Sequence, residues 1–117
     1  MIGIVVTGHG LFAEGMHSSA VMIAGENEHI KYVCFKEDMG LEGLAEKLNA
    51  AYNELADCDG IVVLSGTNLP MIITASTMLS FESDAQALAD ELLFEGKDNV
   101  VRFELAVREE AEEEDGI

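Results

Sequence analysis

The sequence predicts a single α/β domain of three layers, α/β/α, with an open, mainly parallel sheet that ends in a C-terminal edge strand. Two observations support this fold class. Short apolar runs alternate with stretches whose apolar residues recur at helical spacing, which is typical of strands covered on both faces. The chain has 117 residues, 49% of them hydrophobic, which suffices for one core but not for two. We expect the domain to span residues 1–105 and an acidic tail to span residues 106–117.

The first half of the chain has the pattern of strand, helix, strand and helix. Residues 2–6 are apolar and predict a buried strand. From Leu11 onward the apolar spacing is helical, and Gly25 is placed to end that helix. Residues 30–35 predict a second strand. Between residues 41 and 55, leucines and Tyr52 recur at spacings of three and four, which predicts a second helix with Asp38 as its candidate cap.

The second half repeats the alternation. Residues 60–64 predict a third buried strand, and Pro70 suits the first turn of the helix that follows. Ser83 or Asp84 is placed to cap a further amphipathic helix that Gly96 would stop. Residues 100–105 alternate between apolar and charged side chains, which predicts a last strand at an edge with one solvated face.

Charge limits the partners that this chain can bind. Lys and Arg number 6 against 23 Asp and Glu, a net charge of −17, which disfavours nucleic acid and favours a basic protein partner. No stretch approaches the roughly 20 apolar residues of a membrane span, and the first residues lack the basic segment of a signal peptide. We therefore expect a cytoplasmic protein without direct membrane insertion. Cys34 and Cys58 lack metal-ligand spacing, so we expect buried thiols, no metal and no cofactor.

The motif Thr7-Gly8-His9-Gly10 is the strongest functional signal, because it lies between the first strand and the first helix. A helix N-terminus offers unpaired N–H groups and a positive dipole end, and flanking glycines let backbone donors approach an anion. An imidazole held there can accept and pass on a phosphoryl group. We therefore expect His9 to be the nucleophile, with Thr7, Gly8, Gly10 and Leu11 around the phosphate. The alternative is a histidine that only forms a hydrogen bond inside a tight turn.

Other polar residues are also candidates for a functional role. His17 lies within the first helix and His29 opens the second strand, and both are expected at the surface without metal-ligand spacing. Ser65, Thr67 and Asn68 follow the third predicted strand. They are placed either to cap the next helix or to bind near a phosphorylated histidine, and both roles can hold together.

Three motifs carry a resemblance to a known family. Val5-Val6-Thr7-Gly8-His9-Gly10, Ala13-Glu14-Gly15 and the run from Ser65 to Met71 resemble the mannose-type (mannose/fructose/sorbose) enzyme IIA domain of the bacterial sugar phosphotransferase system. The resemblance implies that His9 accepts a phosphoryl group from the phosphocarrier protein HPr and hands it to a IIB component during sugar uptake. It also implies a cytoplasmic homodimer, and we expect residues 100–105 to pair across its interface because an unpaired edge strand is a liability.

One departure from the family follows Leu64. Relatives have an Asp-containing loop there, then a helix and a fourth strand, whereas here Leu64 leads directly into Ser65. The aspartate that orients the histidine in relatives therefore has no counterpart. Either the domain is shortened by a βα unit of roughly thirty residues, or that segment was left out between Leu64 and Ser65, which would leave a break in the chain there. We expect the omission, because a deleted central strand would leave its neighbours unpaired.

Functions of other classes remain as alternatives. A non-catalytic regulatory or binding module with the same fold would bind its partner without passing phosphate onward. A flavodoxin-like carrier would need a hydroxyl-rich loop after the first strand, and a receiver domain would need an acidic cluster there. The motif Thr7-Gly8-His9-Gly10 supplies neither.

Overall fold

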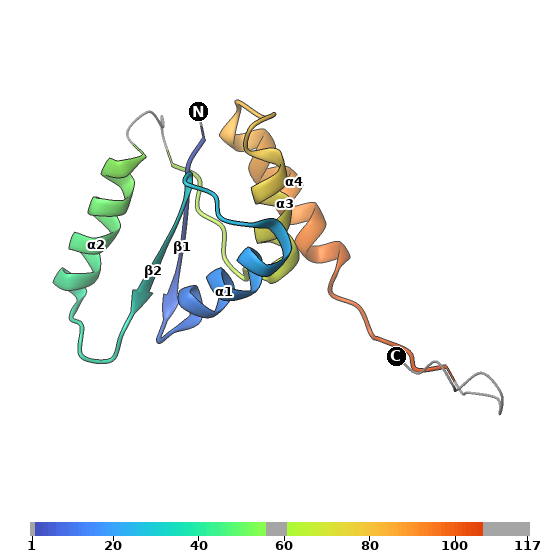
Figure 1. Cartoon of the computed structure of the whole chain (residues 1–117), viewed down its shortest axis with the longest axis horizontal. Coiled ribbons are helices and arrows are strands. Elements are labelled where there is room, and N and C mark those ends of the chain that lie inside the picture. Colours follow the sequence, from blue (N-terminus) through green and yellow to red (C-terminus); the bar gives the residue numbers. More distant parts are fainter. Residues whose placement is uncertain (1, 56–60, 107–117) are drawn as a thin grey trace.

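The computed structural model describes residues 2–55 and 61–106, in which a small parallel sheet lies between helices (Figure 1). The helix α2 covers one side of the sheet, and α1, α3 and α4 lie on the other. This arrangement confirms the predicted α/β fold class. In chain order the elements are β1 (Ile4–His9), α1 (Phe12–Ala24), β2 (Ile30–Phe35), α2 (Leu41–Glu54), α3 (Leu69–Met78) and α4 (Ala85–Asp98).

The sheet brings the ends of β1 and β2 together. The two strands are parallel, and their register runs from Ile4 opposite Ile30 to His9 opposite Phe35. The first strand is therefore shifted from the predicted residues 2–6, and His9 is its last residue, where the turn to α1 begins. Because the strands are parallel, His9 and Phe35 lie at the same carboxyl edge, where open α/β sheets bind ligands.

The core lies between β1 and the helices α1, α3 and α4. Small side chains are among the most deeply buried, with Ala13 and Ala20 almost fully buried on α1 and Ala75 on α3. Larger apolar residues fill the space around them and form one cluster, which includes Val6, Ile30, Met71, Ile72, Leu79, Leu88 and Leu92. This cluster fixes α1 against the sheet, and with it the turn that carries His9.

Helix ends follow the predicted signals in part. Gly25 follows α1 with a φ of 79°, as predicted for a glycine at a helix end. Asp84 caps α4, its side chain accepting a hydrogen bond from the Gln86 N–H at 3.0 Å. The predicted cap Asp38 is wrong, because α2 begins after Gly40 and has no side-chain cap.

Gly96 does not stop α4, which continues to Asp98. It is buried against α3, and a Cβ added there would lie 2.6 Å from the Met71 Cγ. The Asn68 Nδ2 also donates a hydrogen bond to the Gly96 carbonyl at 3.0 Å. The glycine is therefore explained by the close approach of the two helices rather than by a helix end.

Two predicted strands are not formed. Residues 61–64 have no strand pairing, and residue 60 lies outside the described part of the chain. They run beside β1 (Figure 1), and both segments border a mostly apolar cavity of about 590 Å³. No backbone hydrogen bond joins residues 61–64 to β1, which is paired only with β2 in the described residues. The ribbon runs without interruption through residues 61–68 (Figure 1), so the break expected after Leu64 is not seen, and the omission of a segment stays a prediction.

The predicted last strand at residues 100–105 is also not formed. They extend away from the body (Figure 1) and have no strand pairing within the described residues. Phe103 is 81% exposed and Leu105 is 82% exposed. An alternating segment forms a strand only when a partner strand supplies its hydrogen bonds, and the described part of this chain supplies none. Residues 107–117 of the predicted tail lie outside the described residues.

Candidate functional site

The turn between β1 and α1 presents His9 at the protein surface. His9 is exposed, and Gly10 follows it with a φ of 62°, a conformation that favours glycine. The Gly10 N–H donates a hydrogen bond to the Phe35 carbonyl at 2.7 Å, which ties the turn to the end of β2. The helix α1 begins two residues later, at Phe12. The sequence thus places an imidazole on a fixed turn before a helix N-terminus.

The N-terminus of α1 supplies backbone donors beside this imidazole. Leu11 is the N-cap residue, and no side chain caps the helix. The N–H groups of the first turn therefore have no side-chain acceptor, and the positive end of the helix dipole lies next to the turn. The prediction that Gly10 supplies a donor needs correction, because its N–H is already bonded to the Phe35 carbonyl. Leu11 and the residues after it are the remaining donors.

Two aromatic side chains pack against the turn, and sequence reasoning missed both. The rings of His9 and Phe35 are tilted by 43° with centroids 5.3 Å apart. Phe12 packs against Gly8, since a Cβ added at Gly8 would lie 2.6 Å from the Phe12 Cδ2. The signal for Phe35 was present, because it ends the second predicted strand at the carboxyl edge that His9 shares. Within the described residues, no side chain forms a hydrogen bond with the His9 ring.

The residues predicted after the third strand make no hydrogen bond with His9 in the described residues. Thr67 borders the cavity that Thr7 also lines, which does not include His9, and Ser65 is exposed in the segment before α3. Asn68 is the N-cap of α3: its Oδ1 accepts a hydrogen bond from the Met71 N–H at 3.2 Å, while its amide nitrogen binds the Gly96 carbonyl. Of the two roles weighed for Asn68, helix capping is confirmed.

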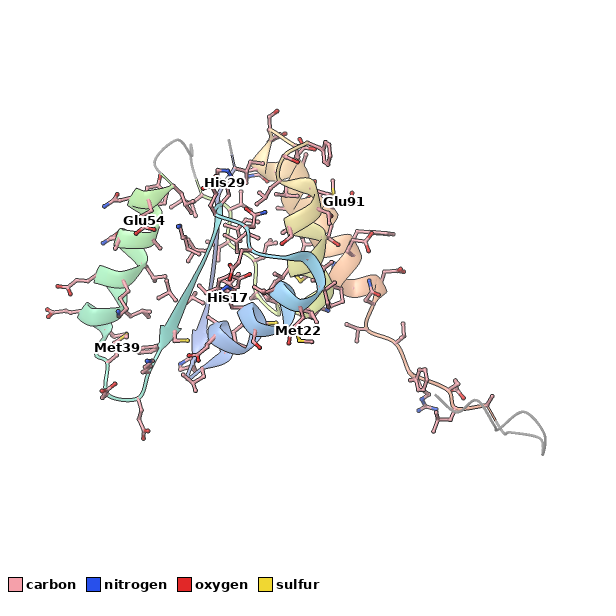
Figure 2. The ribbon with its side chains drawn as sticks, in the orientation of Figure 1. His17, Met22, His29, Met39, Glu54 and Glu91 are labelled. Carbon is pink, nitrogen blue, oxygen red and sulfur yellow. The ribbon has the colours of Figure 1, made fainter. Side chains whose placement is uncertain are left out.

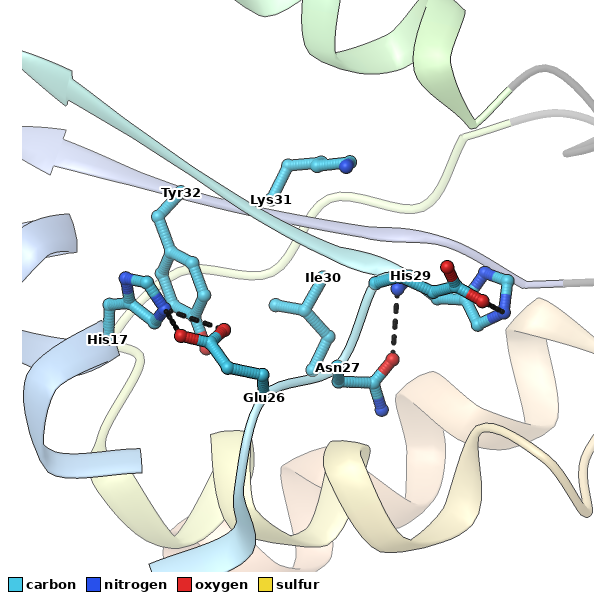
Figure 3. A pocket seen from close by; sticks show the side chains of 8 residues that line it. His17, Glu26, Asn27, His29, Ile30, Lys31 and Tyr32 are labelled. Atoms are coloured by element: carbon cyan, nitrogen blue, oxygen red, sulfur yellow. Dashed lines mark hydrogen bonds and ion pairs between the residues drawn. The ribbon is translucent and has the colours of Figure 1, made fainter. Parts of the chain in front are cut away.

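A second group of polar side chains lines a surface hollow of about 850 Å³ (Figure 3). The His17 Nε2 lies 3.0 Å from Glu26 Oε1, and the His17 ring stacks on Tyr32 with centroids 4.3 Å apart. Burial, and to a lesser extent the charge of Glu26, raises the pKa of Tyr32 above its ordinary value. His29 lies at the other end of the hollow.

This hollow is the weaker candidate. His29 precedes β2 and lies near the amino ends of the strands (Figure 2), whereas His9 lies at their carboxyl ends. The His17 ring is already engaged by Glu26 and Tyr32, so it is not presented to a substrate. The described residues contain no group of three or more His, Cys, Asp or Glu side chains arranged to hold a metal ion. The turn at His9 is therefore the candidate active site.

The fold agrees with comparisons to known proteins. The sequence model of the family described as the PTS system fructose IIA component matches residues 3–65, more than half of the 117 residues. The chain belongs to this family, and it is a component of a sugar phosphotransferase system. No helix in residues 2–55 or 61–106 has the length and apolar character needed to cross a bilayer.

Solved structures of similar fold come from three bacteria. The mannose/sorbose-specific IIA subunit from Enterococcus faecalis aligns with a TM-score of 0.75 at 23% identity, covering 92% of this chain and 98% of that one. The component EIIA from Streptococcus agalactiae aligns with a TM-score of 0.70 at 24% identity, covering 87% of this chain and 97% of that one. A protein from Klebsiella pneumoniae, described as a putative phosphoenolpyruvate-dependent sugar phosphotransferase system permease, aligns with a TM-score of 0.67 at 24% identity, covering 86% of this chain and 89% of that one. At these identities the likeness establishes the fold.

Proposed function

We propose that this chain is a phosphohistidine carrier that accepts a phosphoryl group from phospho-HPr and passes it to a IIB component. One observation carries the proposal. His9 is exposed at the carboxyl end of β1, directly before the uncapped N-terminus of α1. A nucleophilic ring, backbone donors and a positive dipole end are thereby gathered at one place.

The transfer requires no cofactor. The ring nitrogen of His9 that lacks a proton attacks the phosphorus of phospho-HPr, a new phosphorus–nitrogen bond forms, and the bond to HPr breaks with its electron pair leaving on HPr. The other ring nitrogen keeps its proton. In the second transfer a nucleophile of the IIB component attacks the same phosphorus, and the electron pair returns to His9. Because positioning and charge stabilisation dominate phosphoryl transfer, this small site suffices.

Several groups near His9 would stabilise the transferred phosphoryl group. The N–H of Leu11 and those of the first turn of α1 are the closest backbone donors in sequence. We also assign phosphate or partner contacts to Thr7, Gly8, Ser65 and Thr67, since they end a strand or precede a helix at this side of the fold. The net charge of −17 favours basic surfaces on the partners, and those partners place the protein in the cytoplasm.

We further propose a homodimer. Residues 100–105 are an exposed alternating segment without a partner strand in the described residues. Pairing with a second copy would supply the missing hydrogen bonds and cover Phe103 and Leu105.

The absence of a carboxylate hydrogen-bonded to His9 in the described residues favours one second candidate, a binding module that docks its partners without transfer. A phosphoryl-transfer assay distinguishes the carrier from the binding module. The protein is incubated with phosphoenolpyruvate, enzyme I and HPr, and then with a IIB component of the same system. A carrier takes up the phosphoryl group and loses it to the IIB component. A protein that binds HPr but takes up no phosphate is the binding module.

A further inference from the structure

We propose that Phe35 is a positioning residue, whose ring holds the imidazole of His9 in the orientation needed for phosphoryl transfer. This inference rests on the proposed function. In the described residues the rings of His9 and Phe35 lie with centroids 5.3 Å apart, and no side chain forms a hydrogen bond with the His9 ring.

The backbone fixes both partners of this contact. His9 and Phe35 are paired in the register of β1 and β2, at the last position of each strand. The Gly10 N–H then donates to the Phe35 carbonyl at 2.7 Å, so the chain is tied to Phe35 immediately after His9 as well. Because both backbones are fixed, the side chains of His9 and Phe35 are kept close to each other.

The ring contact matters because His9 is exposed. A solvent-exposed imidazole samples several rotamers, and only some of them present the reactive nitrogen to a donor. A tilted aromatic neighbour restricts that sampling and covers part of one ring face, while the nitrogens remain open to the partner. Orientation of this kind is a recognised source of rate in group transfer, where a misplacement of about 1 Å costs roughly a hundredfold.

The test compares Phe35→Leu, which removes the ring but keeps apolar bulk, with Phe35→Tyr, which keeps the ring. Phe94→Leu, at an exposed position on α4, is the control for loss of an aromatic side chain away from His9. Uptake is measured with phospho-HPr and with phosphoramidate, a small donor whose phosphorus–nitrogen bond breaks to release ammonia. The ring protons of His9 are followed by NMR, because a neighbouring aromatic ring shifts them.

We expect Phe35→Leu to lower the rate of uptake at saturating donor about tenfold with both donors, and to move the His9 ring resonances. Phe35→Tyr and Phe94→Leu should stay within about twofold of the parent protein. An unchanged rate in Phe35→Leu overturns the proposal. So does a change confined to the KM for phospho-HPr, since that would make Phe35 a docking residue.

The two donors separate this inference from the proposed function. If phospho-HPr does not label the parent protein but phosphoramidate labels His9, and Phe35→Leu slows that labelling, the carrier function fails and the positioning role stands. If phospho-HPr labels the protein and Phe35→Leu has no effect with either donor, the carrier function stands and the positioning role fails. No label on His9 from either donor overturns both.

Discussion

His9 shows what single residues reveal before a structure is known. The flanking glycines and the change from strand to helix spacing predicted its exposed place at a strand end, and the described residues confirm that place. The contact with Phe35 could not be predicted in the same way, because it depends on the register of two strands. Asn68 was ambiguous for a related reason, since capping and ligand binding require the same polar side chain at the same helix end.

Tyr32 provides a prediction at the residue scale. Its pKa is raised by burial and, secondarily, by Glu26, so the folded protein holds the phenolic proton more tightly than the unfolded chain does. This contribution to stability is present below the ordinary pKa of 10.0 and is lost as the pH rises through the folded-state pKa. In a Tyr52→Phe background, we expect Glu26→Gln to lower the pKa of Tyr32, measured by phenolate absorbance.

Glu28→Gln is the matched control for this prediction, because Glu28 lines the same hollow but does not contribute to the shift. In Glu28→Gln the titration midpoint of Tyr32 should equal that of the parent. Equal Tyr32 midpoints in Glu26→Gln and the parent would contradict the contribution assigned to Glu26.

At the scale of elements, helices were predictable and some strands were not. The helical spacing of apolar residues is a local property, so the positions of α1, α2, α3 and α4 follow from the sequence within a few residues. A strand depends on a partner as well as on its own pattern. Residues 61–64 and 100–105 have the composition of strands but form no backbone hydrogen bonds with a neighbouring strand in the described structure.

The cavity beside β1 leads to a prediction about packing. Ala89 on α4 is only 7% exposed and borders this space of about 590 Å³. We expect Ala89→Leu to raise the free energy of unfolding by about 1 kcal/mol, because the added apolar groups enter existing space. Urea denaturation measures the change.

Ala13→Leu is the control for the packing prediction. Ala13 is fully buried on α1 and does not border the cavity. The same added volume should overpack the core there and lower the free energy of unfolding by about 1–3 kcal/mol. Equal destabilisation by both substitutions would show that the cavity is not available in the folded protein.

At the scale of the whole molecule, the chain is an acidic domain whose sheet is small and whose last described segment projects from the body (Figure 1). We expect residues 100–105 to complete a sheet in a second copy, so the parent protein should have the mass of a homodimer at micromolar concentration. Light scattering after size exclusion measures this. Phe103→Ser should shift the mass toward the monomer, because Phe103 is the large apolar side chain at the centre of the segment.

Phe81→Ser serves as the control for assembly, since Phe81 is 84% exposed but lies outside the segment. It should leave the dimer intact. A parent protein of monomeric mass under these conditions would count decisively against the assembly.

The central claim is that His9 carries the phosphoryl group, and locating the acid-labile phosphate tests it most directly. The full chain is incubated with phosphoenolpyruvate, enzyme I and HPr, and the modified residue is mapped by mass spectrometry under alkaline conditions. We expect phosphate on His9 in the parent protein, none on a folded His9→Ala variant, and unchanged labelling of His17→Ala and His29→Ala. Efficient labelling of His9→Ala, or loss of labelling only in His17→Ala or His29→Ala, would contradict the account.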